Sequence, residues 1–336
     1  MENPILTIAV PTYNGSKTIR NMLDILLPQV TKEIEVLVSD NCSTDNTKEI
    51  IAVYQEKYSC IRYIKNEKNL GADGNFLQCM KLAKGKFTML ISDDDIIIEG
   101  AIKKILSFLK DNPEIRLAYL DTVGFKNRYD GLEFCHKYKK YSPKVEKNIV
   151  TKDKKQFLSY AQRMWGFTST FVWNTERMQS ITNPEKYFNT YFLQCYIHIE
   201  CSNRPDDLLG VIQGPLIAVG EYGIIGNYDT AEVEGVFYRR MIDKAIDGGY
   251  PKDQLSRYYS WKLKHLVSRA IIKEKVAGVK KTKFRNIVAA TDGIFPLRIF
   301  LVSIYFMPKT LCRIILRSYR RYKGLPTETY VNRPTD

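Results

Sequence analysis

The segment TMLISDDDIII, from Thr88 to Ile98, places three consecutive aspartates between two apolar runs. The apolar residues before Asp93 predict a buried strand, which the carboxylates end abruptly. Like charges a few ångströms apart repel one another, and the cost rises as a site loses water. A solvated surface loop would hold Asp93, Asp94 and Asp95 at little cost. Alternatively, a hard cation such as Mg²⁺ or Mn²⁺ would offset their repulsion, so the rest of the chain has to decide.

Strand and helix patterns alternate over the first 125 residues. Apolar, β-rich runs predict strands at 5–13, 33–40, 60–66, 86–92 and 115–125. Helical spacing predicts helices between them at 16–30, 43–58, 71–85 and 99–113. Alternation of this length is typical of βαβ units with right-handed crossovers. It predicts an α/β fold with a mostly parallel, Rossmann-like central sheet and flanking helices.

Three polar clusters lie where predicted strands end. The carboxyl ends of parallel strands share one edge of a sheet, and α/β proteins bind ligands there, so we expect the clusters to converge. The aspartate run therefore belongs to a predicted ligand-binding edge rather than to an arbitrary margin of the core. The three clusters are Thr12-Tyr13-Asn14, Ser39-Asp40-Asn41 and Asp93-Asp94-Asp95.

The pattern loosens after about residue 126. Helices are predicted at 154–165 and 187–203, and strands at 168–174 and 208–220. The segment EYGIIGNYDTAEVEG, residues 221–235, carries two glycines at Gly223 and Gly226 and predicts a lid that closes on a ligand. Helical patterns dominate from about 230 to 275.

The charge of the 336-residue chain is unevenly distributed. Residues 1–250 carry 32 basic and 32 acidic side chains, whereas residues 251–336 carry 19 basic and 5 acidic ones. The whole formal net charge of +14 therefore lies in the last quarter. This asymmetry indicates a neutral body and a basic tail that meets an anionic partner.

Three observations predict a cytoplasmic protein. The seven cysteines are scattered, without a CxxC pair or zinc spacing, which is typical of reduced thiols. The start, MENPILTIAVPTYN, lacks the basic region and apolar stretch of a signal peptide. No run reaches the roughly 18 to 20 apolar residues that a spanning helix needs.

Two nucleotide-binding motifs are missing from the sequence: the GxGxxG of dehydrogenases and the GxxxxGK[ST] of P-loop enzymes. Three other segments, in order, resemble the motifs of family 2 glycosyltransferases of the bacterial surface-polysaccharide type, which have the GT-A fold. They are VPTYNGSKTIRNMLDILLPQ, EVLVSDNCSTDNT and NLGADGNFLQCMKLAKGKFTMLISDDD, and the match covers about residues 5–125. The resemblance implies a nucleotide-sugar donor, Mn²⁺ or Mg²⁺ as cofactor, and transfer with inversion.

The resemblance also assigns residues to the donor and the metal. Asp94 is implied as the direct metal ligand and catalytic residue, because the family's first aspartate falls on Ser92. Asp93 and Asp95 are implied to contact the ribose or metal-bound water, with Asp95 counted beside Asp94 at the metal. The implied donor-binding residues are Pro11, Thr12, Tyr13, Asn14, Asp40, Asn69, Gly71 and Asp93.

Each donor-side assignment has a structural alternative. Asp40 could cap the following helix together with Ser43. Tyr13 and Asn14 could serve turn chemistry alone. Asn69 and Gly71 could be a cap and a loop. All three clusters fall at one sheet edge, which favours the ligand-binding interpretation.

The general base is the least determined residue of the predicted site. An inverting transfer needs a carboxylate or histidine near the acceptor hydroxyl. The position where the family places an acid reads Asn189-Thr190 in this chain. A lone histidine on an apolar helix is more often a core residue than a base. The candidates are Glu185, His198 and Glu200, and then Asp229 and Glu232 in segment 221–235.

The predicted function is inverting, metal-dependent transfer from a nucleotide-sugar to a lipid-linked oligosaccharide. A UDP-sugar is favoured, since Asp40 can accept a hydrogen bond from uracil N3–H. A nucleotidyltransferase and a nucleic-acid-binding protein remain as alternatives. The predicted organisation is a catalytic domain, 1–230, and a basic helical region, 231–336. The donor half is 1–125 and the acceptor half is 126–230.

The basic tail contains an apolar run from Ile299 to Met307, nine residues and too short to cross a bilayer. Beyond Pro308 the sequence is amphipathic. Basic residues recur on one face at Lys309, Arg313, Arg317 and Arg320 or Arg321, with Leu311, Ile315, Tyr319 and Tyr322 around the other. This pattern predicts a helix in the interface of an anionic membrane and an enzyme peripheral to its inner face. The alternative is a packed helix with a solvated basic face.

Overall fold

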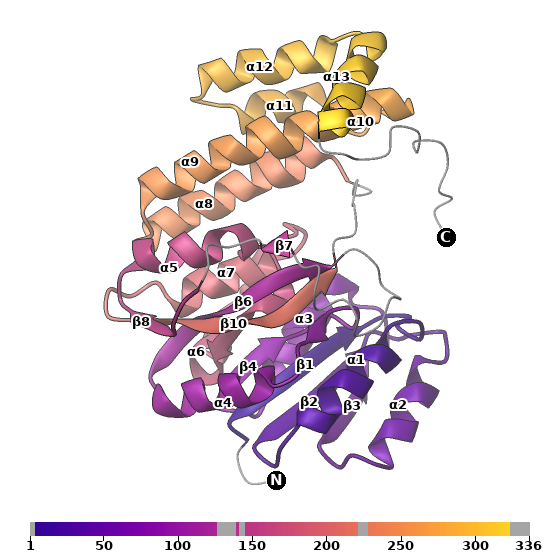
Figure 1. Cartoon of the computed structure of the whole chain (residues 1–336), viewed down its shortest axis with the longest axis vertical. Helices are drawn as coiled ribbons and strands as arrows, with labels where there is room; N and C mark the ends of the chain where they lie inside the picture. Colours follow the sequence, from indigo (N-terminus) through magenta and orange to yellow (C-terminus); the bar gives the residue numbers. More distant parts are fainter. Residues whose placement is uncertain (1–3, 126–138, 141–144, 221–227, 323–336) are drawn as a thin grey trace. The chain divides into compact units, whose positions relative to one another are not determined.

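The computed structural model describes residues 4–125, 139–140, 145–220 and 228–322 (Figure 1). The chain divides into two compact units. Unit 1 is Met1–Tyr222 with Asp247–Tyr250, and unit 2 is Gly223–Ile246 with Pro251–Asp336. The division at 222/223 lies eight residues before the boundary that the sequence suggested at 230/231.

Unit 1 is built on one sheet with the strand order β3-β2-β1-β4-β9-β6-β10-β5. Two short strands extend it, since β7 pairs with β6 and β8 pairs with β10. The main strands are β1 (Leu6–Thr12), β2 (Ile34–Asp40), β3 (Ile61–Lys65), β4 (Phe87–Leu90), β5 (Ile96–Ile97), β6 (Ile115–Phe125), β9 (Phe171–Asn174) and β10 (Leu208–Gly220). The short strands are β7 (Lys139–Lys140) and β8 (Ile149–Thr151).

Most strands of this sheet run in one direction. β3, β2, β1 and β4 pair in parallel, and β6 and β10 pair in parallel. β9 is antiparallel to both β4 and β6, so β6 and β10 point the same way as β1. Among the eight main strands of the described residues, only β9 and β5 run in the opposite direction. The prediction of a mostly parallel α/β sheet is confirmed.

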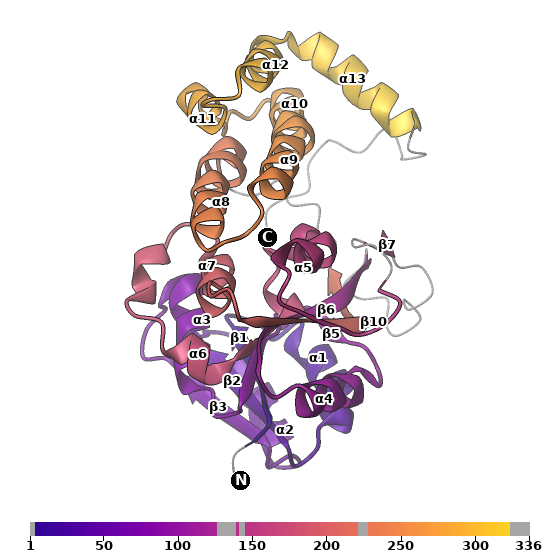
Figure 2. The ribbon, with the colours of Figure 1, turned by 90° about the vertical axis from the view of Figure 1, so that its left-hand side faces the viewer.

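Helices cover the sheet because their apolar residues recur at helical spacing. In α1, Ile19, Met22, Leu23 and Leu26 are buried, which is an i, i+3, i+4, i+7 stripe. Figure 2 shows α1 and α4 on one face, and α3, α6 and α7 on the other. The helices are α1 (Ile19–Leu26), α2 (Thr47–Gln55), α3 (Gly71–Leu82), α4 (Ala101–Asp111), α5 (Lys154–Ala161), α6 (Thr175–Gln179) and α7 (Leu193–Cys201).

Unit 2 is helical throughout its described residues. α10 packs against both α12 and α13, and α11 packs against α12. The helices are α8 (Tyr238–Asp247), α9 (Lys252–Lys262), α10 (Ser268–Ala277), α11 (Phe284–Ala290), α12 (Phe295–Phe306) and α13 (Lys309–Tyr322). Two π-helical turns, η6 (Glu232–Phe237) and η7 (Leu263–Val267), lead into α8 and α10.

Among the described residues, no single helix combines the length and apolar content needed to cross a membrane. α12 and α13 meet that test of length and composition only as a pair, bent by 109° at the break between them. The break falls at Met307 and Pro308, where the sequence predicts the change from an apolar to an amphipathic segment.

Candidate functional site

The aspartate loop meets the end of β1 through Thr12. The Thr12 hydroxyl donates a hydrogen bond of 2.5 Å to Asp93 Oδ2. Gly15 lies directly against this pair, and a Cβ atom at Gly15 would stand 2.3 Å from both Asp93 Oδ2 and Thr12 Oγ1. A side chain at residue 15 would therefore displace the Thr12–Asp93 pair that joins the first and third polar clusters.

The loop after β2 joins the loop after β1. Asn41 N–H donates to the Thr12 carbonyl oxygen at 2.9 Å. Asn14 N–H donates to Ser43 Oγ at 2.9 Å, and Asn14 Oδ1 accepts from Thr44 N–H at the same distance. Asn14 has a φ of +52°, in the left-handed region that asparagine tolerates better than most residues. The predicted convergence of the three clusters on one edge is thus present.

Asn41 carries the connection onward to the start of α3. Its Nδ2 donates to Asn69 Oδ1 at 2.9 Å and to the Gly71 carbonyl at 3.1 Å, while its Oδ1 accepts from Leu70 N–H at 2.8 Å. Gly71 has a φ of +73°, which favours glycine. Asn69 and Gly71 therefore shape this loop, as expected for the alternative in which they have a structural role. The loop lies at the predicted ligand-binding edge.

Asp73, in the first turn of α3, links this edge to the second half of unit 1. Asp73 Oδ2 accepts a hydrogen bond of 2.7 Å from Asn189 N–H. Burial raises the pKa of the Asp73 carboxyl above its ordinary value of 3.8, although the hydrogen bond from Asn189 acts in the opposite direction. The position where the family places an acid reads Asn189-Thr190 in this chain. In the structure, Asp73 of α3 brings a carboxylate to that position.

Ser169 connects the second half back to the aspartate loop. Its Oγ donates to Asp95 Oδ2 at 2.6 Å and accepts from Ser92 N–H at 2.9 Å. Near Ser169, the Gly166 carbonyl accepts from Gln194 Nε2 of α7 at 2.7 Å. Together these contacts form a closed series around the edge, from Asp93 through the three loops and α3 to α7 and back to Asp95.

The three aspartates differ in exposure. Asp95 is buried and accepts from Ser169 through Oδ2, and its implied place at the metal stays a prediction. Asp93 and Asp94 are partly buried, and Asp94 Oδ1 accepts from Ser92 Oγ. Asp93 and Asp94 are thus the more accessible carboxylates of this loop.

The donor set at Asp93 and Asp94 fits a divalent cation that arrives with a phosphate ligand. No group of three His, Cys, Asp or Glu in the described part of the chain is placed to hold a metal ion by itself. Mg²⁺ is commonly bound through one or two carboxylates together with substrate phosphates, so it needs no such group. The oxygen ligands present are those that Mg²⁺ and Mn²⁺ prefer.

Asp40 is fully buried at the end of β2. Its Oδ1 accepts from Ser43 N–H at 2.8 Å and its Oδ2 from Tyr63 OH at 2.5 Å. The first of these bonds lies within the loop before α2 and does not cap that helix, whose N-cap residue is Asn46. Burial and the neighbouring Asp40 carboxylate raise the pKa of the Tyr63 phenol. Both carboxylate oxygens of Asp40 are thus hydrogen-bonded within the chain, and the implied direct base contact stays a prediction.

The remaining donor-side residues of β1 separate into a core residue and a surface residue. Pro11 is buried inside the strand, and its implied contact with the donor stays a prediction. Tyr13 is 50% exposed just beyond the strand, where its ring is available for stacking.

His198 is a core residue, which rules out its predicted role as a base that meets an acceptor. It is fully buried in α7, and Trp173 Nε1 donates to His198 Nδ1 at 2.9 Å. The ring centroids of Phe171 and His198 are 4.0 Å apart. Burial lowers the pKa of His198 to about 3.

Glu185 and Glu200 lie at the opposite edge of the sheet. Glu185 pairs with Lys81 at 2.9 Å near the end of α3, and this hydrogen bond lowers the pKa of Glu185. Glu200 sits at the end of α7, where Oε1 accepts from Tyr187 OH at 2.6 Å and Oε2 from Asn203 at 3.1 Å. Because α3 and α7 begin at the aspartate edge, their last turns point away from it.

Asp229 and Glu232 belong to unit 2, where the Asp229 side chain has a structural role. Asp229 is buried, with Oδ1 accepting from the backbone N–H groups of Ala231 and Glu232. Its Oδ2 accepts from Lys283 N–H and Asn286 Nδ2, both at 2.8 Å. The first part of the predicted lid, residues 221–227, lies outside the described residues, and its second part is this capped helix start.

Comparison with known proteins identifies the class. Residues 7–178, just over half of the chain, match the profile of glycosyl transferase family 2. The abequosyltransferase RfbV of Salmonella typhimurium is 26% identical over 280 residues, 81% of each chain. A GalNAc(5)-diNAcBac-PP-undecaprenol beta-1,3-glucosyltransferase of Campylobacter jejuni is 30% identical over 104 residues, 31% of this chain and 34% of that protein. The chain belongs to glycosyl transferase family 2 and is a glycosyltransferase.

Solved structures place the fold. S. aureus TarS 1–349 in complex with UDP-GlcNAc superimposes with a TM-score of 0.60 at 15% identity, covering 95% of this chain and 92% of TarS 1–349. The mannosyltransferase PcManGT of Pyrobaculum calidifontis, in complex with GDP-Man and Mn²⁺, gives 0.52 at 14% identity, covering 90% and 85%. The mixed α/β fold with C-terminal helices is therefore of the GT-A type.

Proposed function

We propose that the protein transfers a sugar, with inversion, from a UDP-sugar to a lipid-linked glycan in a metal-dependent reaction. The observation that carries this proposal is the closed series of contacts that gathers three polar loops around the partly buried Asp93 and Asp94. Like-charged neighbours at such an edge are stable when a ligand of opposite charge offsets them.

Asp94 and Asp93 are the residues that would hold Mn²⁺ or Mg²⁺ together with the donor diphosphate. A bound cation of this kind supplies neutralisation of the charge that develops on the leaving diphosphate. Thr12 holds the Asp93 carboxylate in place through its 2.5 Å hydrogen bond. Ser92 does the same for Asp94.

Asp73 is our candidate for the general base. The acceptor hydroxyl oxygen attacks the anomeric carbon, the bond from that carbon to the diphosphate oxygen breaks, and the hydroxyl proton passes to the Asp73 carboxylate. One displacement of this kind inverts the configuration. Support comes from the position of Asp73 against Asn189, and from burial, which raises its pKa and makes the carboxylate more basic.

Two observations support a UDP-sugar over other donors. The TarS structures that share the fold contain UDP-GlcNAc and UDP, whereas PcManGT contains GDP-Man. Asp40 lies at the same edge and could accept a hydrogen bond from uracil N3–H. We propose the lipid-linked acceptor because the Campylobacter relative is named for one.

The proposed site of action is the inner face of the cytoplasmic membrane, reached through α13. Cys312 and Leu316 of α13 are buried, as expected for a helix packed on α10, and Arg269 lies 5.0 Å from the Tyr319 ring. Ile314 is 59% exposed, and Leu311 and Ile315 are exposed with it. An outward apolar face beside exposed arginines is typical of a helix in a membrane interface.

The donor experiment tests the enzymatic proposal. Purified protein is titrated with UDP, dTDP, CDP and GDP in the presence of Mn²⁺, and then incubated with the matching sugar nucleotides. We expect the tightest binding for UDP and slow release of UDP from one UDP-sugar, which EDTA abolishes. Tightest binding of GDP would overturn the donor assignment, and undiminished turnover in EDTA would overturn the metal. Release of inorganic diphosphate from a nucleoside triphosphate would instead indicate a nucleotidyltransferase.

Flotation with vesicles tests the membrane proposal. Full-length protein should float with phosphatidylglycerol vesicles and remain behind with phosphatidylcholine. The Ile314→Ser/Ile315→Ser variant removes outward apolar groups and should lose most of the floating fraction. The matched control is Lys252→Gln/Lys264→Gln, which changes two exposed residues of unit 2 outside α13. Equal flotation of the two variants would refute a role for α13. Binding to DNA that displaces the vesicles would favour the nucleic-acid alternative.

A further inference from the structure

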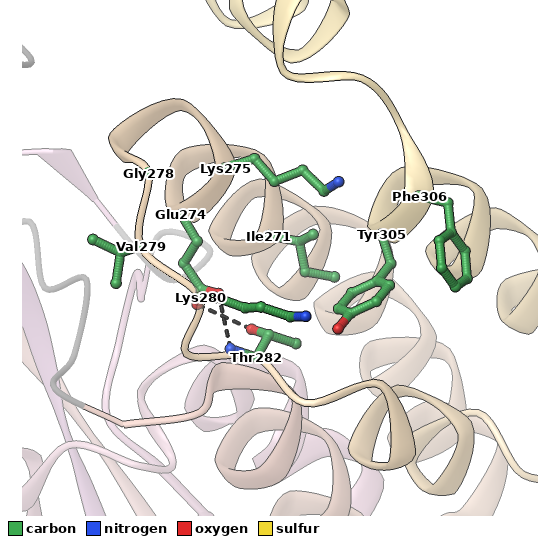
Figure 3. A pocket seen from close by; sticks show the side chains of 9 residues that line it. All are labelled: Ile271, Glu274, Lys275, Gly278, Val279, Lys280, Thr282, Tyr305 and Phe306. Atoms are coloured by element: carbon green, nitrogen blue, oxygen red, sulfur yellow. Dashed lines mark hydrogen bonds between the residues drawn. The ribbon is translucent and has the colours of Figure 1, made fainter.

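Unit 2 contains a pocket that the proposed reaction does not use. It has a volume of about 340 Å³ and lies between the end of α10, the loop that follows it and the end of α12 (Figure 3). Both charged and apolar side chains line it. The lining residues are Ile271, Glu274, Lys275, Gly278, Val279, Lys280, Thr282, Tyr305 and Phe306.

The wall formed by the 278–282 loop is fixed by hydrogen bonds within the chain. Gly278 ends α10 with a φ of +77°, and Val279 N–H donates back to the Glu274 carbonyl at 2.9 Å. The buried Glu274 carboxylate accepts from Thr282 N–H at 2.9 Å and from Thr282 Oγ1 at 3.0 Å, as the dashed lines in Figure 3 mark. The loop, and with it the pocket, is therefore preformed.

Lysine ammonium groups surround the opening. Lys275 Nζ and Lys280 Nζ each lie 5.9 Å from the centroid of the Tyr305 ring. Figure 3 shows the Lys280 side chain pointing toward this ring. Lys275 Nζ donates to the Met307 carbonyl at 2.8 Å, which holds its charge at this place. Lys309 Nζ is also close, since a Cβ atom at Gly278 would stand 3.6 Å from it. The Glu274 carboxylate is turned to the Thr282 backbone, so positive charge prevails at the opening.

Exposed aromatic rings continue from the pocket to the surface. Phe306 is 67% exposed and Phe284 is 40% exposed, although both are apolar. The ring centroids of Phe284 and Phe306 are 5.6 Å apart, and those of Tyr305 and Phe306 are 5.2 Å apart. An anionic group held by the lysines would thus have apolar surface directly beside it.

We propose that this pocket binds the phosphate headgroup of an anionic phospholipid. The lysines neutralise the phosphate, and the phenylalanines lie along the start of the acyl chains. The choice of a membrane lipid as occupant rests on the proposed function at a membrane. The charge and shape of the pocket do not depend on that function.

Calorimetric titration with short-chain lipids below their micelle concentration tests the pocket without a bilayer. Full-length protein is titrated with dihexanoyl-phosphatidylglycerol, dihexanoyl-phosphatidylcholine and inorganic phosphate. We expect one phosphatidylglycerol per chain, with both other ligands binding at least about tenfold more weakly. Because each lysine near an anionic headgroup contributes about 1 kcal/mol, Lys280→Gln should weaken phosphatidylglycerol about fivefold and Lys275→Gln/Lys280→Gln about 30-fold.

The variants separate the pocket from a general charge effect. Lys280→Gln keeps the Lys275–Met307 hydrogen bond, so it tests the site even if the double variant fails to fold. The control Lys252→Gln/Lys264→Gln removes the same charge from other helical turns and should change the affinity less than about twofold. UDP binding, measured in parallel, should be the same in all variants.

Four results would overturn the proposal: no binding of phosphatidylglycerol, equal binding of phosphatidylcholine, equal binding of inorganic phosphate, or an equal loss in the control. None of them bears on the sugar transfer, which the donor titration tests separately. Conversely, a protein that fails to bind any nucleotide but passes the lipid test would overturn only the proposed reaction.

Discussion

The two edges of the unit 1 sheet hold their acids in different ways. At the amino end of β2, Glu35 pairs with Arg62 at 2.7 Å and accepts from Thr7 at 2.7 Å, and Glu185 pairs with Lys81 nearby. At the carboxyl edge, Asp93, Asp94 and Asp95 accept hydrogen bonds from Thr12, Ser92 and Ser169. Asp73 accepts from a backbone N–H at the same edge.

The difference teaches which acids stabilise the fold and which are ready to bind. A carboxylate paired with an arginine or lysine is already neutralised, and removing its partner leaves an uncompensated charge. A hydroxyl group that donates to a carboxylate orients it without neutralising its charge. The opposite edge should therefore matter for stability and the carboxyl edge for turnover.

The largest expected effect follows from Asp94→Asn. Loss of a metal ligand and of its charge should lower turnover by about 1000-fold or more, while the melting temperature stays unchanged. Glu200→Gln at the opposite edge is the matched control and should retain turnover within about twofold. Turnover and thermal unfolding are measured on the same preparations. Similar losses in both variants would contradict the division between edges.

Asp73→Asn should lower kcat by about 100-fold, the usual contribution of a general base. The amide can still accept the hydrogen bond from Asn189, so the loss reports the charge and not the loop contact. Glu185→Gln is the control, with an expected change below about twofold.

The pH profile distinguishes Asp73 as a base from Asp73 as a mere anchor. A base acts only when ionised, and burial raises the pKa of Asp73 above 3.8. Activity of the native enzyme should therefore rise with pH through that raised pKa and then level off. The Asp73→Asn variant should lack this acid limb, and an unchanged limb in the variant would assign it to another group.

Glu35→Gln should affect stability and leave the reaction intact. The buried Glu35 carboxylate joins Arg62 to Thr7 and also accepts from Lys84 N–H at 3.1 Å. Replacing it removes the ion pair and should lower the free energy of unfolding by about 2 kcal/mol. Urea unfolding measures this cost, and kcat and KM for the donor should be unchanged. A loss of turnover without a loss of stability would reverse the expected roles of the edges.

Much of the fold was readable from the sequence because its strands are long, apolar and regularly spaced. The strands predicted at 115–125 and 208–220 match β6 and β10 residue for residue. The spacing of apolar residues carries no information on strand direction. It predicts β9 as a strand but not its antiparallel pairing with β4 and β6. β5, with two residues, is too short to give a pattern.

The parts of the site in loops directly after predicted strands could be predicted from the sequence. Contacts between residues far apart in the sequence could not. The convergence of Thr12 and Asp93 on one edge follows from their places at the carboxyl ends of predicted parallel strands. Asp73 and Asn189 are 116 residues apart in sequence, and no local signal links them. For Glu200, the residue pattern predicts a helix but not the direction in which α7 crosses the sheet, and that direction decides at which edge Glu200 lies.

The smallest expected effect comes from two threonines at the two ends of β1. Thr12→Val removes the hydrogen bond to Asp93, worth about 1 kcal/mol, and should weaken UDP binding in Mn²⁺ about fivefold with little change in stability. Thr7→Val removes the hydrogen bond to Glu35 and the acceptor for Gly85 N–H, so it should lower the melting temperature and leave UDP binding unchanged. The two substitutions are chemically identical and lie on one strand, so only their edge differs. Calorimetric titration and thermal unfolding of both variants should therefore give opposite patterns, and a common pattern would show that the hydroxyl groups serve the strand and not the edges.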